Sequence, residues 1–73
     1  MWKPFKVGRL EGEETQRGSV RGEIHAPTAN PAAPAPVYWN VIDFKRRGDC
    51  LVASGYAATT DAAKAACLAA MGS

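Results

Sequence analysis

The sequence contains few of the residues that carry catalysis or bind metals. His25 is its only histidine, Cys50 and Cys67 are its only cysteines, and it has no glycine-rich phosphate-binding motif. An acid–base pair or a metal site needs several such groups close together, and the spacing of the two cysteines fits no pair of zinc ligands. We therefore expect a protein that is not an enzyme and has no cofactor and no bound metal.

The sequence also lacks long apolar runs. No apolar stretch follows a basic N-terminal start, and no segment has the length that spans a bilayer. We expect a cytoplasmic protein with no membrane partner, in which both cysteines stay reduced.

Charge of one sign is scarce as well. Nine Lys and Arg residues oppose seven Asp and Glu residues, which leaves a net charge of +2. Residues 1–25 carry five basic and four acidic groups, residues 26–36 carry none, and residues 37–73 carry four and three. No segment has the positive excess that is typical of an electrostatic nucleic-acid binder.

The 73 residues indicate a single domain near the lower size limit for independent folding. Much of the 47% hydrophobic content is alanine, which buries little area. A core this small gains stability from a protein partner or from self-association. We expect it to be built from the large apolar residues Trp2, Phe5, Val7, Leu10, Val20, Ile24, Val37, Trp39, Val41, Ile42, Phe44, Leu51, Val52, Tyr56, Leu68 and Met71.

Residues 1–25 contain two short segments of alternating apolar and polar residues. Phe5–Leu10 and Ser19–His25 therefore favour strands. The charged, glycine-containing stretch between them, Glu11–Gly18, predicts a loop or a mobile hairpin tip.

Residues 26–36 have no charge and hold four prolines and five alanines, which favours an extended connector. Pro31 and Pro34 have the spacing of a PxxP ligand, but no basic residue flanks them, so we interpret the segment as a spacer.

Residues 37–73 predict a ββα unit. The β-branched and aromatic stretch 37–45 and the stretch 50–57 favour strands joined by a turn at Gly48. Alternation along the first strand places apolar residues on both faces, with Val37, Trp39 and Val41 on one and Tyr38, Asn40, Ile42 and Phe44 on the other. Thr59 or Thr60 would cap an alanine-rich helix that ends before Gly72. Its spacing predicts one packing face formed by Ala63, Ala66, Cys67, Ala70 and Met71. The fold class that we expect is α+β, with three or four mostly antiparallel strands and one C-terminal helix packed on one face.

Several motifs of this ending are shared with known proteins. The W-x-V strand at Trp39, the Gly48 turn, the ASG-x-A-x-T junction that starts at Ala53, and the alanine-rich helix resemble the ββα ending of short bacterial and phage proteins, which mostly have no assigned activity. The resemblance covers about half of the chain. It implies a bacterial or phage origin, and a bacterial or infected host cell as the location.

A weaker similarity links the same half to double-stranded RNA-binding domains. Gly55 and the helix residues Ala63, Lys64, Ala66 and Cys67 are similar to the ending of that family. The family places phosphate-binding lysines at the start of the helix, where this chain has Thr60 and Asp61. An aspartate there repels phosphate, and the chain has no room for the family's first helix.

One candidate binding surface stands out. The basic run Lys45, Arg46 and Arg47 at the expected turn, with Tyr38 and Trp39 on the adjoining strand, could bind phosphate and stack on a base. The alternative is a solvated turn beside a core tryptophan, which is the commoner arrangement. We therefore expect a small protein-binding or accessory module, with weak nucleic-acid binding through these five residues as the alternative.

Overall fold

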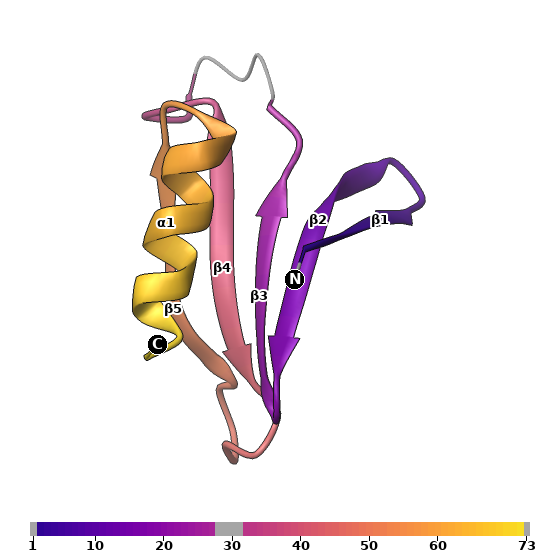
Figure 1. Cartoon of the computed structure of the whole chain (residues 1–73), viewed down its shortest axis with the longest axis vertical. Helices are drawn as coiled ribbons and strands as arrows, with labels where there is room; N and C mark the ends of the chain where they lie inside the picture. The colour runs from indigo at the N-terminus through magenta and orange to yellow at the C-terminus, as the bar shows by residue number, and fades with distance from the viewer. Residues whose placement is uncertain (1, 28–31, 73) are drawn as a thin grey trace.

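A computed structural model of the chain describes residues 2–27 and 32–72. It contains five strands and one helix, namely β1 (Lys3–Val7), β2 (Leu10–Arg17), β3 (Val20–His25), β4 (Val37–Asp43), β5 (Leu51–Ala57) and α1 (Thr60–Ala70). The strands form one antiparallel sheet in the order β1-β2-β3-β4-β5, and α1 packs on β3, β4 and β5 (Figure 1). The expected α+β class, with a C-terminal helix on one face of the sheet, is confirmed.

The number of strands was underestimated, because the segment expected to be a loop is strand β2. Gly8 and Gly18 both have positive φ, and each occupies the first position of a two-residue turn, between the pairs Val7–Leu10 and Arg17–Val20. A glycine there matches the turn twist to the twist of the flanking strands. Two tight hairpins therefore replace the expected loop, and the sheet has five strands instead of three or four.

Residues with capping roles lie at both ends of the helix. Thr59 is the N-cap, and its hydroxyl accepts a hydrogen bond from the Ala62 amide at 3.1 Å. Asp61 lies in the first turn, where the helix dipole favours a negative charge. Gly72 follows the last turn with a φ of 79°. Of the two expected caps, Thr59 is therefore the one used.

The helix lies close to the sheet because small residues face each other across the interface. A Cβ atom on Gly22 of β3 would lie 2.5 Å from Cys67 Sγ and 2.7 Å from Met71 Sδ. The Cys67 thiol also lies 3.6 Å from the carbonyl oxygen of Asn40 on β4. Ala63 and Cys67 are fully buried, as the helical spacing predicts. The contacts of Cys67 place this part of the helix over β3 and β4.

The core is smaller than the sequence suggests. Ile24, Val37 and Ala63 form its centre, with Trp2, Trp39 and Ala57 packed against them. The prediction was wrong for six of the large residues expected in the core, which are exposed: Val7, Leu10, Phe44, Leu51, Val52 and Tyr56. A single helix covers only one face of a five-stranded sheet, so apolar residues on the other face stay in contact with solvent.

Part of the Pro/Ala-rich connector at 26–36, including Pro31 of the PxxP spacing, lies outside the described residues. Within the part of the chain that the structure describes, no helix combines the length and the apolar character that crossing a membrane requires.

Candidate binding face

The strand register sorts the side chains into two faces. Trp39 is paired with Ile24 on β3 and with Gly55 on β5, and these residues face α1. The ring of Trp39 covers Gly55, where an added Cβ would lie 3.0 Å from the indole. The opposite face carries Phe5, His25, Tyr38 and Tyr56 together with the residues that alternate in phase with them along each strand. We call this surface the open face, because α1 lies on the other side of the sheet.

An aromatic row crosses the open face. The register aligns Phe5, Gly12, His25, Tyr38 and Tyr56 on five neighbouring strands. The ring centroids are 6.0 Å apart for Phe5 and His25, 5.0 Å for His25 and Tyr38, and 5.2 Å for Tyr38 and Tyr56. These are distances at which aromatic pairs attract each other. Gly12 lies between Phe5 and His25 in the register, and an added Cβ there would clash with the backbone carbonyl of Ile24.

His25 is the one titratable member of this row. Burial lowers the pKa of its imidazole from the ordinary value of 6.5, because a partly buried ring disfavours the charged form. Its Nε2 atom lies 3.6 Å from Glu23 Oε1, which acts in the opposite direction when the ring is protonated. At neutral pH the row is therefore an uncharged surface.

A polar patch follows the aromatic row on the open face. Arg21 hydrogen-bonds to Glu23 and lies 3.6 Å from Glu14, so the two carboxylates share one guanidinium. Asn40, directly opposite Glu23, is only 8% exposed. Among the described residues, nothing donates a hydrogen bond to its buried Oδ1 atom.

The open face ends in a second apolar area beyond the polar patch. Phe44 is 53% exposed, and the guanidinium of Arg21 lies 5.8 Å from the centre of its ring. Leu51 is 41% exposed and is paired with Ile42. The face thus has apolar side chains at both ends and neutralised charges between them.

The structure separates the five residues of the predicted binding surface. Tyr38 lies in the aromatic row, whereas Trp39 points to the opposite face and packs against the core. Lys45, Arg46 and Arg47 are exposed, as expected, but they lie in the turn after β4, at the other end of the strand from Tyr38 (Figure 1). The role of all five residues in binding stays a prediction.

The turn after β4, which contains Lys45, Arg46 and Arg47, lies next to residues that are distant from it in the sequence. The turn between β2 and β3 lies beside it, since the Phe44 amide donates to the Ser19 carbonyl and the Ser19 hydroxyl donates to Asp43. Hydrogen bonds from the Lys45 amide and from Ser19 lower the pKa of the Asp43 carboxyl. We call this end of the sheet, residues 16–21 and 43–51, the basic end. Its charged residues are Arg17, Arg21, Lys45, Arg46 and Arg47, with Asp43 and Asp49.

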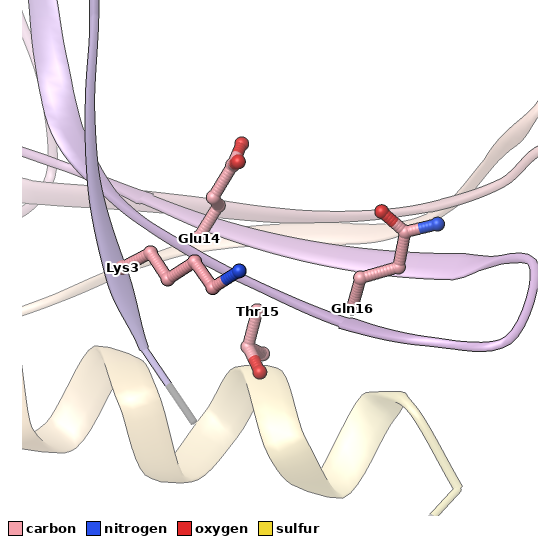
Figure 2. A pocket seen from close by; sticks show the side chains of 4 residues that line it. All are labelled: Lys3, Glu14, Thr15 and Gln16. Carbon is pink, nitrogen blue, oxygen red and sulfur yellow. The ribbon is translucent and has the colours of Figure 1, made fainter.

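Two hollows mark the N-terminal hairpin. The first has a volume of about 250 Å³ and is lined by Lys3, Glu14, Thr15 and Gln16. In Figure 2, Glu14 and Gln16 point away from the helix, Thr15 points toward it, and Lys3 extends between them from β1. The second hollow is lined by Arg9, Leu10, Glu11, His25, Ala26 and Pro27.

The two cysteines occupy different environments, and both are free. Burial raises the pKa of the Cys67 thiol, which lies between α1 and the sheet. Cys50 lies in the basic turn, with its sulfur 3.5 Å from the carbonyl oxygen of Arg46. Within residues 2–27 and 32–72, no group of three or more His, Cys, Asp or Glu residues could hold a metal ion.

Sequence reasoning found one member of the aromatic row, Tyr38, and missed its alignment with Phe5, His25 and Tyr56. The alternation within each strand was visible, but the row depends on the register between strands. The signal was the pair of V-G-R-L and R-G-S-V turns, which fix the register of the first two hairpins.

No protein-family model, curated protein or solved structure matches the chain. The class is therefore defined by the architecture itself, as a small α+β domain in which a five-stranded antiparallel meander carries a helix on one face and an aromatic row on the other.

Proposed function

We propose that the chain is a small, non-enzymatic protein-binding module that docks a partner protein on its open face. The observation that carries this proposal is the exposure of large apolar side chains on the side of the sheet that α1 does not cover, including 53% for Phe44 and 47% for Tyr56. Tyr56 and Phe44 belong to two separate apolar areas of this face, and exposed apolar areas rimmed by polar residues mark interaction sites in soluble proteins.

The charges of the open face indicate the chemistry of the partner. Lys3 and Arg21 balance Glu14 and Glu23, so the face is close to neutral and offers little attraction to a polyanion. Protein interfaces are enriched in Tyr, Phe and Arg, which are the residue types found here. The partner that fits is a protein with an apolar surface.

The size of the face suits such a complex. The two longest dimensions of the molecule are 34 Å and 25 Å, and the sheet extends across this plane (Figure 1). A standard interface buries about 800 Å² on each partner, which is comparable to one whole sheet face of this size. The similarity of the ββα ending to short bacterial and phage proteins supports an accessory role encoded by a phage or prophage.

Site-specific photo-crosslinking in cells that express the protein tests the proposal. Benzoylphenylalanine would replace Phe44 or Leu10 on the open face, and Ala65 on the exposed surface of α1 would serve as the control position. We expect one adduct of the same mass from both open-face positions and none from Ala65. Equal adducts from all three positions, or none from the open face, would contradict the proposal.

A second candidate function, weak nucleic-acid binding, is favoured by the assembly of the basic end. Arg21 is paired with Glu14 and Glu23, so the charge of this end comes from the other four basic and the two acidic residues, which leave +2 within two short segments. Phe44 lies beside them and is exposed for stacking. If this function holds, affinity for single-stranded DNA should fall as salt rises, with a slope of about 0.7 in log units for each phosphate contact.

Replacing both Arg46 and Arg47 with Glu should then abolish most of that salt-sensitive binding. Lys6→Glu is the matched control, because Lys6 is exposed on β1, outside the basic end. The nucleic-acid hypothesis fails if no binding is measured at low ionic strength, or if Lys6→Glu weakens binding as much as the double variant.

A further inference from the structure

The two edges of the sheet differ in how they are protected. Unpaired strand edges attract other strands, and proteins block them with charged residues, above all lysine, and with proline. The β1 edge carries Lys3, Pro4 and Lys6 within five residues. Strand β5, Leu51–Ala57, contains neither a charged residue nor a proline, and among the described strands β4 is its only neighbour. Its protection is confined to its first residues, where a register shift against β4 falls at Val52 and the side chains of Arg46 and Asp49 hydrogen-bond to the carbonyl and the amide of Leu51.

The side chains of β5 are also arranged symmetrically. Ser54 is the central residue of the strand, with the small residues Ala53 and Gly55 beside it and the large residues Val52 and Tyr56 next outward. Val52 is 43% exposed and Tyr56 is 47% exposed. An antiparallel pairing of this strand with itself, centred on Ser54, places each Val52 opposite a Tyr56 and each Ala53 opposite a Gly55.

We propose that β5 pairs with β5 of a second copy of this chain, which makes a two-fold symmetric dimer with a continuous ten-stranded sheet. Pairs of a β-branched residue and an aromatic residue directly opposite each other stabilise antiparallel strands. The two-fold symmetric dimer contains two Val52–Tyr56 pairs. Like charges do not face each other between the two strands, because β5 contains no charged residue. A second copy fits better than an unrelated strand because the size pattern of β5 is complementary to itself.

The helix lies on one face of the sheet and does not occupy the in-plane edge that this pairing uses. It packs on β3, β4 and β5, so the two-fold axis would bring the helices of the two copies next to each other on the same side of the joined sheet. The open faces of the two copies would lie on the same side of the joined sheet. A partner protein could then contact both copies at once.

Sedimentation or light scattering of the purified chain across micromolar concentrations tests the dimer. We expect a dimer mass for the unmodified chain, and a dissociation constant at least tenfold higher for Val52→Lys, because both symmetric pairs are lost and a charge enters the edge. Leu10→Lys is the control, since Leu10 is an apolar residue outside β5 that is 55% exposed, against 43% for Val52. A monomer at all concentrations, or equal weakening by both variants, would overturn the proposal.

The register has its own test, which does not depend on the stability of Val52→Lys. Ser54→Cys, combined with Cys50→Ser to remove the accessible native thiol, should form a disulfide-linked dimer under mild oxidation, because the two-fold axis brings the Ser54 positions opposite each other. The control is Cys50→Ser combined with Ala65→Cys, which places the new cysteine on the exposed surface of α1. If the Ser54→Cys variant forms the linked dimer no faster than this control, the register is wrong.

Discussion

Gly22 allows the helix to pack closely on the sheet. Its missing side chain leaves the space that Cys67 and Met71 occupy. We predict that Gly22→Ala destabilises the fold by about 1–3 kcal/mol, as overpacking of a filled core does. Urea unfolding measures this change. Cys67→Ala in the same chain removes the nearest sulfur, so the double variant should lose less stability than the sum of the two single variants. A Gly22→Ala variant as stable as the parent would show that the helix does not lie this close.

His25 reports the environment of the aromatic row. Because burial lowers its pKa from 6.5, the unfolded chain takes up the proton first as the pH falls. The contribution of His25 to stability is therefore fully present above about pH 6.5 and is lost as the pH falls through the lower, folded-state pKa. Since His25 is the only histidine, an NMR titration of its ring gives the folded value directly. A midpoint at or above 6.5 would mean that attraction to Glu23 outweighs burial.

At the scale of single residues, the sequence predicts which way the side chains of β4 point but not what they meet. Alternation places Tyr38 and Trp39 on opposite faces, as the structure confirms. The cluster of Arg21, Glu14 and Glu23 joins residues from two strands, so it depends on register. The orphaned oxygen of Asn40 depends on packing, which no local pattern encodes.

At the scale of elements, the glycine turns determined the N-terminal strands more than β-propensity did. The segment Glu11–Arg17 is charged and has little β-propensity, yet it lies inside strand β2. It is held there because Gly8 and Gly18 make the tight turns on both sides and fix its pairing with β1 and β3. The C-terminal ββα unit was predictable because its strands are β-branched and aromatic, and because its helix has a cap at each end.

The cap of α1 makes a prediction at this scale. Thr59→Ala should destabilise the fold by about 1 kcal/mol, because it leaves the Ala62 amide without its acceptor. Thr60→Ala is the matched control and should cost less, since Thr60 is already the first residue of the helix. Thermal or urea unfolding of both variants measures the difference. A Thr60→Ala variant that loses as much stability would contradict the assignment of the cap.

At the scale of the whole molecule, one helix and a five-stranded sheet leave a surface that the chain itself does not bury. The sequence predicted apolar residues on both faces of β4, but it placed six exposed residues in the core because it gave no measure of how much of the sheet one helix covers. The basic end was hidden for a similar reason. Arg17 and Arg21 are far from Lys45, Arg46 and Arg47 in the chain and meet them only through the sheet.

The central claim of this account is that the folded chain buries one face of its sheet and leaves the other open for a partner. The most direct measurement is NMR relaxation enhancement by a soluble paramagnetic gadolinium chelate. We predict strong broadening of the Phe44 ring and the Leu10 methyl groups, and weak broadening of Trp39 and Val41 beneath the helix. Protection of Phe44 and Leu10 equal to that of Val41 would contradict the claim.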